Sequence, residues 1–415
     1  MVLATHAMGA RGLHQAEAPV NSGSSGHTAS LLPAWAMPLL ERLAGTLPRP
    51  TLVAVAMSGG VDSSVAAGLL SAAGLPVVGV TMRLWAEEDF ERGEGGCCSL
   101  DAVEDARRVC SRLGIPHYVI NLREQFERAV VGHFLEEYRG GRTPNPCVRC
   151  NETVKFADLY LRMSRVGASH LATGHYAQVE QGGPAGVVLR RAHDSRKDQS
   201  YTLYRTPPEV LIRCLFPLGS LEKPRVRELA AALGLGVAAK PDSQELCFVG
   251  GGDHRELLAK ELTGSFSAGP VVDREGVLVG RHRGLPFYTV GQRHGLGLAA
   301  RRPDAEPLYV YAVDRARNTL RVGPWSSLLR SNCHICRVVA LVPPSSRGWH
   351  RATAQLRAHA RPTPVTWRRI PGERAAIRFA TPQAAVSPGQ SLVLYDGDQV
   401  VAGGEIEVEP GEEFN

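Results

Sequence analysis

The sequence predicts an α/β protein in which a parallel-sheet domain is followed by a small central domain and a C-terminal β-barrel. Between Thr51 and Leu262, short apolar runs alternate with helix-like segments, as expected for repeated βα units. A turn rich in glycine and serine, Ser58 to Ser64, directly follows the first apolar run. After Leu262 the chain changes to short stretches separated by glycine-rich turns, a pattern typical of short β-strands.

Four apolar runs of the first region are predicted to be parallel strands: Leu52–Ala56, Pro76–Met82, His117–Asn121 and His170–Thr173. Apolar residues near helical spacing predict helices at Asp101–Leu113, Val154–Val166 and Arg225–Leu233. Ligands of such sheets bind beyond the carboxyl ends of the strands, where the turn at Ser58 falls. We therefore expect a ligand at this turn.

The β-rich part of the chain is predicted to contain two groups of short strands. The first group is Gly269–Asp273, Val277–Gly280, Leu308–Asp314 and Thr319–Val322. The second group, which fits a small barrel, is Cys336–Val342, Ala352–Leu356, Thr363–Arg368, Arg374–Phe379, Ser391–Tyr395 and Val400–Val408. The predicted domains are therefore residues 49–262, 263–330 and 331–415.

Residues 1–48 are predicted to form a disordered or loosely ordered extension. The stretch Asn21–Gly26 has the composition of a linker, and several prolines interrupt any long helix. A transit peptide would be rich in arginine, whereas only Arg11, Arg42 and Arg49 occur here. We therefore expect a loose tail rather than a targeting segment.

The composition is that of a globular protein with a mild basic excess, because 47 Lys and Arg against 41 Asp and Glu give a net charge of +6. This charge is compatible with a polyanionic partner but does not require one. The longest apolar run, Leu31–Leu40, contains two prolines and falls well short of the ~20 residues of a membrane span. Nine cysteines scattered through a long chain favour a reducing compartment, so we expect a cytoplasmic protein.

The turn Ser58-Gly59-Gly60-Val61-Asp62-Ser63-Ser64 has the features of a phosphate-binding loop. Its glycines allow positive φ and close approach of an anion, and the N-terminus of the following helix favours negative charge. An ordinary turn would not need three hydroxyls and an aspartate as well, so a bound nucleotide is the preferred interpretation. No lysine lies between Thr51 and Leu75, which excludes a Walker-type loop. The motif resembles the PP-loop of ATP pyrophosphatases, which implies cleavage of ATP to AMP and pyrophosphate.

Two cysteines follow a proline-rich turn in Thr143-Pro144-Asn145-Pro146-Cys147-Val148-Arg149-Cys150, and a helix-like segment begins just after them. A thiol at such a helix start, near Arg149 and Lys155, is biased toward the reactive thiolate. A further cysteine, Cys247, lies between Leu246 and Phe248. These three thiols are the candidates for covalent chemistry.

The remaining cysteines have simpler interpretations. Cys333-x-x-Cys336 could complete a zinc site with Cys147-x-x-Cys150, but the two halves of such a site normally lie closer in sequence. Burial as small hydrophobic residues is the preferred interpretation of Cys97, Cys98, Cys214, Cys333 and Cys336.

Further motifs follow in order: Ala172-Thr173-Gly174-His175-Tyr176, Lys197-Asp198-Gln199-Ser200-Tyr201, Leu246-Cys247-Phe248 and Thr289–Gly297. With the PP-loop and the two-cysteine segment, they resemble the tRNA-specific 2-thiouridylase (MnmA) family from about residue 52 to residue 408. The resemblance implies ATP-dependent replacement of the C2 oxygen of the wobble uridine by sulfur, through an adenylated base. It also implies magnesium with the ATP, the tRNAs for Lys, Glu and Gln as substrates, and a cysteine desulfurase or sulfur-relay protein as donor.

The resemblance assigns roles to individual residues. ATP would be bound by Ala56, Met57, Ser58, Gly59, Gly60, Val61, Asp62 and Ser63, together with Met82 and Gly174. The target base would meet Asn145, Pro146 and Cys147, and other parts of the tRNA would meet His175, Lys197, Asp198, Gln199, Arg357 and Gln390. Cys150 matches the nucleophile of the family, and Cys247 matches the cysteine that carries a persulfide.

The chain departs from the family at two of these places. Many members have aspartate, proposed as a general acid or base, where Cys147 stands, and a tyrosine where Ala358 follows Arg357. Two schemes of sulfur transfer are therefore open. In the first, Cys247 carries the persulfide and Cys150 resolves it, leaving a disulfide. In the second, all three thiolates hold a 4Fe–4S cluster with one iron free to bind hydrosulfide.

Two other classes of protein share part of this pattern. An ATP-dependent ligase or amidotransferase of the same superfamily would have the PP-loop but would need neither the three cysteines nor an RNA-binding barrel. A non-catalytic RNA-binding or sulfur-relay protein would not need an intact Ser58–Ser64 turn. Both alternatives explain less of the chain than tRNA thiolation does.

Overall fold

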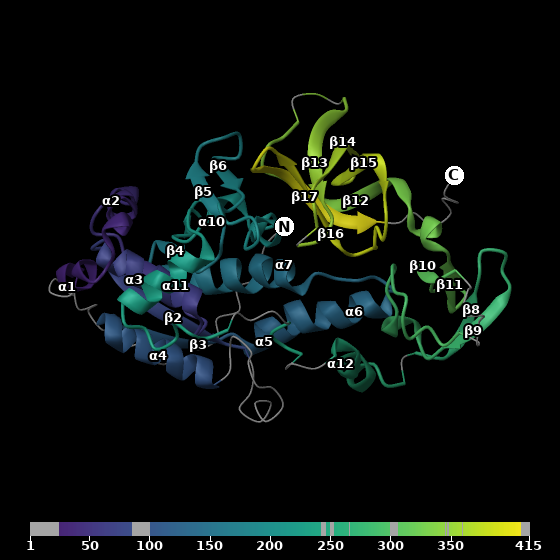
Figure 1. Ribbon diagram of the computed structural model, residues 1–415, viewed down its shortest axis with the longest axis horizontal. Helices are drawn as coiled ribbons and strands as arrows, with labels where there is room; N and C mark the ends of the chain where they lie inside the picture. The colour runs from purple at the N-terminus through teal and green to yellow at the C-terminus, as the bar shows by residue number, and fades with distance from the viewer. Residues whose placement is uncertain are drawn as a thin grey trace, which may run out of the picture.

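The structure is a computed structural model that describes residues 25–84, 100–241, 246–249, 253–264, 266–298, 306–344, 346, 348–358 and 360–407. Three parts follow one another along the chain: a first domain built on a parallel sheet, a central four-stranded sheet and a C-terminal barrel (Figure 1). No helix in these residues is long and apolar enough to cross a membrane. The α/β class, the parallel sheet and the barrel predicted above are confirmed.

The sheet of the first domain has five parallel strands in the order β3-β2-β1-β4-β7. They are β1 (Val53–Ala56), β2 (Val77–Arg83), β3 (His117–Asn121), β4 (His170–Ala172) and β7 (Cys214–Leu215). The chain runs outward from β1 to β3 and then crosses to β4 on the other side of β1. The carboxyl ends of β1 and β4 therefore flank the point where the winding reverses, which is where doubly wound sheets bind ligands.

The core around this sheet depends on close packing of small residues. Helix α3 (Val61–Ala72) is buried along nearly its whole length, and a Cβ at Gly68 would lie 2.5 Å from a methyl carbon of Leu233. The other helices of the first domain and its linkers are α4 (Leu100–Leu113), α5 (Arg123–Phe126), the π-helical segment Glu127–Gly132, α6 (His133–Arg139), α7 (Pro146–Cys150), the π-helical segment Asn151–Leu159, α8 (Tyr160–Arg165), α9 (Ser200–Leu203), α10 (Pro208–Leu211), α11 (Lys223–Ala232) and α12 (His254–Glu261).

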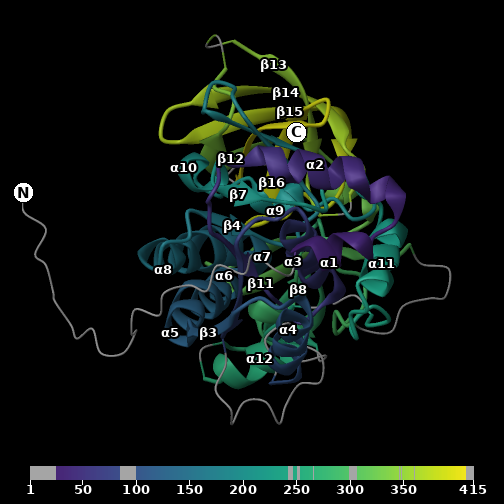
Figure 2. The same cartoon turned by 90° about the vertical axis from the view of Figure 1, so that its left-hand side faces the viewer.

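Part of the predicted N-terminal extension belongs to the folded domain. Helices α1 (Ser25–Ser30) and α2 (Met37–Thr46) lie beside α3 and α11 (Figure 2), joined by the 3-10 turn Ala34–Ala36. Leu39, Leu40 and Leu43 of α2 enter the same core as α3. These leucines lie on one face of α2 and are buried in this core. The prediction of a loose tail is therefore wrong for residues 28–47. Residues 1–24 lie outside the described residues.

The central sheet has the strand order β10-β11-β8-β9. Its strands are β8 (Gly269–Val272), β9 (Leu278–His282), β10 (Tyr309–Asp314) and β11 (Thr319–Gly323), with 3-10 turns at Leu285–Phe287 and Trp325–Leu328. Phe134 and Tyr138 of α6 pack in one core with Val271 and Val310 of this sheet. Helix α6 of the first domain therefore forms part of the core of the central domain.

The C-terminal barrel is closed, because β12 pairs with both β15 and β17. Its strands are β12 (Arg330–Ala340), β13 (His350–Gln355), β14 (Thr363–Ile370), β15 (Arg374–Gln383), β16 (Ser391–Asp396) and β17 (Gln399–Glu407). A hairpin of the first domain, β5 (Gln178–Gln181) and β6 (Val187–Arg190), pairs with β17 through Arg190 and Gln399. The sequence analysis did not predict this hairpin, which attaches the barrel to the first domain.

Candidate active site

The segment Ser58–Ser63, called the nucleotide loop below, connects β1 to α3 and is held by its own hydroxyls. The Ser58 N–H donates to the Ser63 Oγ (3.1 Å), and the Ser64 Oγ donates to the Gly60 carbonyl (2.7 Å). Gly59 has φ +67°, and a Cβ there would overlap the backbone of Ala102 in α4. The loop therefore needs glycine at residue 59, and it presents the N-terminus of a twelve-residue helix.

Gly174 lies directly against the nucleotide loop from the end of β4. A Cβ on Gly174 would lie 2.5 Å from the Ser63 nitrogen and 2.6 Å from the Asp62 carbonyl carbon. Met82, at the end of β2, packs half-buried against the same core as Ala56, the last residue of β1. The residues predicted to bind the nucleotide thus meet at the carboxyl edge of the sheet, although they are far apart in sequence.

The carboxylate of Asp62 in the nucleotide loop bonds to two residues, Lys223 and Tyr176, to which the sequence analysis assigned no role. The Lys223 Nζ donates to both oxygens of Asp62 (2.7 and 2.8 Å), and the Tyr176 hydroxyl donates to Oδ1 (2.9 Å). Lys223 is the first residue of α11 and its side chain is only 9% exposed. Nothing in the sequence marked Lys223 except its place before Pro224 at a helix start.

The two-cysteine segment lies at the start of a continuous helix, Pro146–Arg165, formed by α7, a π-helical segment and α8 and called the thiol helix below. Its N-cap is Asn145, whose Oδ1 accepts a hydrogen bond from the Val148 N–H (3.2 Å). The prediction that the helix begins after Cys150 is therefore wrong. An N-cap asparagine followed by proline is a helix start signal, and it places Cys147 in the first turn.

The two thiols of this helix differ in environment. Cys147 is exposed, whereas Cys150 is half-buried and packs against the core that contains Val148. Cys247 is also half-buried and packs against that same core. The next residue, Phe248, meets Phe126 and Phe134 edge-on at ring-centroid distances of 6.2 and 5.0 Å. One hydrophobic cluster therefore holds Cys150 and Cys247, which lie almost a hundred residues apart in the sequence.

The segment before the thiol helix lies where all three domains meet. The Thr143 N–H donates to the carbonyl of Pro388 (2.8 Å), and the amide of Gln390 donates to the carbonyls of Thr143 (2.9 Å) and Pro144 (3.2 Å). The Thr143 hydroxyl also lies 3.4 Å from that of Thr289 in the central domain. The barrel and the central domain together therefore position the turn that leads into Cys147.

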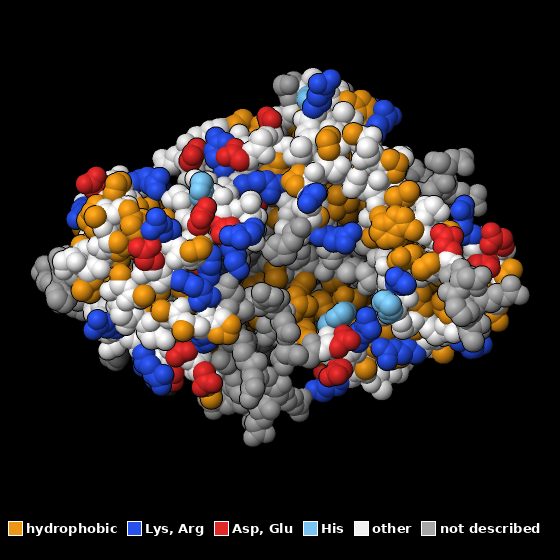
Figure 3. Space-filling model, viewed as in Figure 1, with side chains coloured by type: hydrophobic (Ala, Val, Ile, Leu, Met, Phe, Trp, Pro, Cys, Tyr) orange, Lys and Arg blue, Asp and Glu red, His pale blue; other side chains and the backbone are white. Residues whose placement is uncertain are grey.

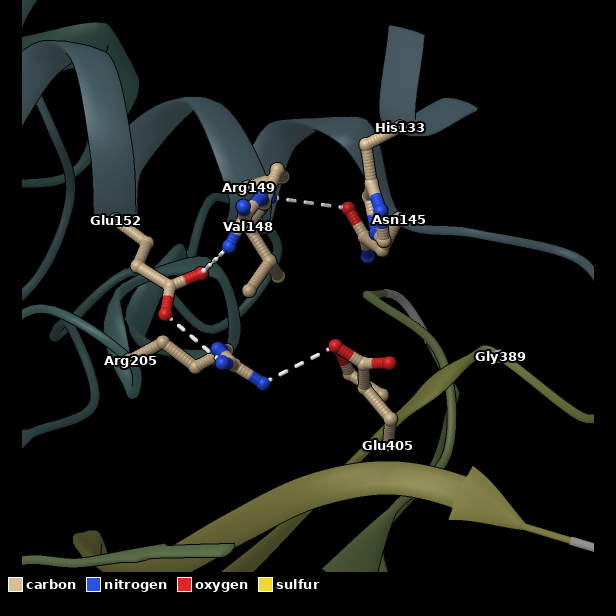
Figure 4. A pocket seen from close by; sticks show the side chains of 9 residues that line it. His133, Asn145, Val148, Arg149, Glu152, Arg205, Gly389 and Glu405 are labelled. Carbon is tan, nitrogen blue, oxygen red and sulfur yellow. Dashed lines mark hydrogen bonds and ion pairs between the residues drawn. The ribbon is translucent and has the colours of Figure 1, made fainter. Parts of the chain in front are cut away.

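A pocket lies between the thiol helix and the barrel (Figure 4), lined by His133, Asn145, Val148, Arg149, Glu152, Arg205, Gly389, Ser391 and Glu405. Arg205 joins Glu152 of the thiol helix (2.8 Å) to Glu405 of β17 (3.1 Å), and Arg149 also pairs with Glu152 (3.0 Å). The Arg205 side chain is only 9% exposed. The charge of Arg149, expected to favour a thiolate at Cys150, is thus shared with Glu152.

The described residues do not gather a metal-binding set around the three thiols. No group of three His, Cys, Asp or Glu side chains in the described ranges is placed to hold a metal ion. Cys147 and Cys150 lie one turn apart on a helix, and Cys247 comes from a separate turn. The predicted 4Fe–4S ligands therefore do not form a ready site in the described residues.

The other cysteines behave as core residues where the structure describes them. Burial raises the pKa of Cys110 to about 12, and it also raises the pKa of Cys214 and of Cys333. Cys333 packs into the barrel core and Cys336 is half-buried on the same strand. The preferred interpretation of Cys214 is confirmed, Cys333 is half-buried against the barrel core, and Cys97 and Cys98 lie outside the described residues.

The residues assigned to tRNA fall into two groups. Lys197–Gln199 lies against the His175 segment, because the Tyr176 N–H donates to the Gln199 Oε1 (3.0 Å) and the Gln199 N–H donates to the Tyr176 carbonyl (2.8 Å). Arg357 is exposed at the end of β13 in the barrel. Figure 3 shows Lys and Arg side chains gathered across the middle of one face, between the first domain and the barrel.

Asp198 and His175 are less available to a partner. The buried carboxylate of Asp198 accepts hydrogen bonds from Arg191 (2.9 Å), from the Ala192 N–H (3.0 Å) and from the Ser200 hydroxyl (2.9 Å). Burial, followed by the charge of Lys155, holds the pKa of His175 well below its usual value, so the ring is neutral near pH 7. Asp198 therefore orders the chain around Lys197 and Gln199.

The fold and the nucleotide loop define a nucleotide-binding α/β protein with two appended β-domains. Three family models match the chain in succession: the tRNA methyl transferase HUP domain over residues 51–251, the tRNA methyl transferase PRC-barrel domain over residues 255–324, and the aminomethyltransferase beta-barrel domain over residues 330–406.

Curated relatives match over most of their length. The chain is 47% identical over 362 residues to tRNA-specific 2-thiouridylase MnmA of Heliobacterium modesticaldum, covering 85% of this chain and 92% of that protein. It is 46% identical over 373 residues to the protein of that name from Roseiflexus castenholzii, covering 85% and 98%. For the Chloroflexus aurantiacus protein of that name the identity is 48% over 355 residues, covering 85% and 97%. The chain belongs to the tRNA-specific 2-thiouridylase (MnmA) family.

Proposed function

We propose that this protein is a tRNA-uridine 2-sulfurtransferase, which uses ATP to replace the C2 oxygen of the wobble uridine by sulfur. One observation carries the proposal beyond family membership. Ala56 at the nucleotide loop, Met82, Cys150 and Cys247 all contact one hydrophobic core. We propose that a nucleotide on the loop and a sulfur on the cysteines act on one base bound beside this shared core.

The proposed reaction has two stages. The C2 carbonyl oxygen attacks the α-phosphorus of ATP, the α–β P–O bond breaks, and pyrophosphate leaves. Adenylation is needed because the carbonyl oxygen leaves poorly, whereas AMP leaves readily. The terminal sulfur of a Cys247 persulfide then adds at C2 and expels AMP. Finally the Cys150 thiolate attacks the Cys247 sulfur, which releases the 2-thiouridine and leaves a Cys150–Cys247 disulfide for reduction by an external dithiol.

The nucleotide loop would hold the phosphates with Ser58–Ser63 and the N-terminus of α3, with Gly174 and Met82 beside the nucleotide. Magnesium would supply positive charge to the phosphates. Asp62 is the carboxylate of this loop, and a single carboxylate suits an ion that is held mainly by substrate phosphates and water. Asp62 already forms hydrogen bonds with Lys223. Its main role is therefore to hold the nucleotide loop in place.

The tRNA would lie across the first domain, the central domain and the barrel, for which we retain the boundaries 49–262, 263–330 and 331–415. His175, Lys197, Gln199, Arg357 and Gln390 are the proposed contacts, with Asp198 ordering the loop that carries two of them. The target base would leave the anticodon stack to meet Asn145, Pro146 and Cys147, at a cost of a few kcal/mol that stem-loop contacts offset. We propose the tRNAs for Lys, Glu and Gln as substrates, a cysteine desulfurase or sulfur-relay protein as donor, and the cytoplasm as location.

The test is tRNA-dependent release of AMP. Purified protein is incubated with radiolabelled ATP, a persulfide donor (a cysteine desulfurase with cysteine) and a dithiol, with and without unmodified tRNA for Lys. We expect AMP and pyrophosphate to form only with the tRNA, and 2-thiouridine to accumulate in equal amount. AMP release that needs an amino acid or ammonia instead would indicate a ligase or amidotransferase, and tRNA binding without AMP release would indicate a relay protein.

A further inference from the structure

The nucleotide loop lacks a cation of its own. No lysine or arginine lies between Thr51 and Leu75, so the loop offers a bound phosphate only backbone N–H groups, hydroxyls and the helix N-terminus. Walker-type loops supply a lysine for this purpose. A loop that must release pyrophosphate, as proposed above, has the same need for positive charge.

Two lysines reach the loop from distant parts of the chain, and their surroundings distinguish them. Lys223 is buried and forms hydrogen bonds with both oxygens of the half-buried carboxylate of Asp62, so its charge is largely offset by that carboxylate. Its role is to hold Asp62 and the start of α3 in place. It therefore contributes little net positive charge to the surface of the loop.

Lys240 lies at the rim of the loop. Its Nζ is 3.2 Å from the Gly59 carbonyl oxygen and 2.9 Å from Oδ2 of Asp105 in α4. The side chain is 38% exposed, in contrast to that of Lys223. An ammonium group has three N–H donors, and in the described part of the chain Gly59 and Asp105 account for two of them. Asp105 also pairs with Arg108 (3.5 Å), so it offsets only part of the charge of Lys240. The third donor of Lys240 is left for an incoming phosphate oxygen.

From this arrangement we infer that Lys240 binds the β- and γ-phosphates of ATP and is a catalytic residue of the adenylation step. The inference rests on the proposed function, because adenylation is the step that breaks the α–β bond. Negative charge grows on the pyrophosphate as that bond breaks, and an ammonium fixed beside the loop stabilises it. Bonding to the Gly59 carbonyl holds the ammonium against the backbone of the nucleotide loop.

Binding measurements with nucleotides of different phosphate length test this inference. Lys240→Met removes the charge while keeping the chain length, and Lys240→Arg keeps the charge. Lys260→Met, at a position 62% exposed on α12, is the matched control. Calorimetry measures the Kd of each variant for ATP, for AMP and for pyrophosphate, and thermal unfolding reports folding.

Lys240→Met should weaken the binding of ATP and of pyrophosphate by roughly 10- to 100-fold, the loss of one charge-assisted hydrogen bond. Binding of AMP should stay unchanged, because AMP lacks the phosphates that Lys240 contacts. Lys240→Arg should recover most of the ATP affinity, and Lys260→Met should match the unmodified protein throughout.

Two results would overturn the inference. Equal losses for ATP and AMP with a lower unfolding midpoint would mean that Lys240 only braces the loop. Unchanged ATP affinity in Lys240→Met would mean that it makes no phosphate contact. Failure of the unmodified protein to release AMP with tRNA would instead refute the proposed function. The comparison of the Kd for ATP with the Kd for AMP would still decide whether Lys240 contacts the phosphates.

Discussion

At the scale of single residues, the site depends on close backbone contacts that admit no side chain. Gly174 and Gly59 both press against backbone atoms, which cannot move aside as the end of a flexible side chain can. Gly174 meets the first turn of α3, and Gly59 meets the start of α4. The end of β4 thus approaches the start of α3 closely at Gly174, and the nucleotide loop approaches α4 closely at Gly59.

Gly174→Ala should disturb the nucleotide loop more than the whole fold. The new methyl group would lie 2.5 Å from the Ser63 nitrogen, so the start of α3 must shift. We expect a loss of unfolding free energy of about 1–3 kcal/mol and at least a tenfold weaker Kd for ATP. Gly236→Ala is the control, because no atom lies within 4 Å of the added Cβ. Equal effects of the two substitutions on ATP binding would contradict this account.

The Asn145 N-cap determines where the thiol helix begins. Asn145→Ala should lower the free energy of unfolding by about 0.5–2 kcal/mol and reduce the thiolation rate, because Cys147 and Cys150 lie in the helix that it caps. Asn145→Asp keeps an accepting oxygen and should retain stability. Asp253→Ala removes a similar cap from α12 and provides the control for stability alone. If Asn145→Ala left both stability and rate unchanged, the cap would have no such role.

At the scale of elements, the thiol helix is attached to the barrel by buried charge. Arg205 lies between Glu152 of that helix and Glu405 of β17, and Glu405 also pairs with Arg337 of β12. Ion pairs buried to this degree contribute little net stability, but removing one partner leaves the other charges uncompensated. The pairs therefore fix how the helix and the barrel are arranged.

Arg205→Met should lower the free energy of unfolding by about 3–5 kcal/mol, because Glu152 and Glu405 then lose their shared partner. Chemical denaturation followed by circular dichroism measures the change. Adding Glu152→Gln and Glu405→Gln to Arg205→Met should restore much of the loss. A single substitution within about 0.5 kcal/mol of the unmodified protein would show that the network does not hold the two elements together.

At the scale of the whole molecule, buried and half-buried histidines make stability depend on pH. Burial lowers the pKa of His117, His133, His170, His175, His254 and His282 below the usual value. Since these groups bind protons more readily in the unfolded chain, the unfolded state gains protons first as the pH falls. Unfolding free energy should therefore be highest above pH ~6.5 and decrease as the pH falls toward ~5.5. A stability that is constant or rises over this range would contradict the assigned burial.

Much of the architecture could be predicted from the sequence because its signals are local. The period of the apolar residues located β1 to β4, helix α4 and most strands of the barrel within a few residues, whereas β12 begins at Arg330 and not at Cys336 as predicted. The glycine and serine pattern located the nucleotide loop. The family resemblance named Gly174 and Gln390, whose contacts the periodicity alone could not reveal.

Contacts between distant segments could not be predicted in this way. The docking of α2 on α3 depends on a core shared by segments on either side of β1, and the pairing of β6 with β17 depends on how the domains meet. Lys223 and Lys240 reach the loop only after the chain has folded, so no local pattern identifies them. The start of the thiol helix is different, because its signal, Asn145 before Pro146, was present in the sequence.

The central claim is that ATP on the nucleotide loop and sulfur on Cys247 act together on the wobble uridine. Its most direct test is mass spectrometry of that nucleoside after unmodified tRNA for Lys is incubated with ATP, a sulfur donor and either the unmodified protein or a variant. The unmodified protein and Cys147→Ala should form 2-thiouridine, whereas Cys150→Ala and Cys247→Ala should form none. Full product from Cys247→Ala, or loss of product in Cys147→Ala with iron bound to the unmodified protein, would contradict the persulfide scheme.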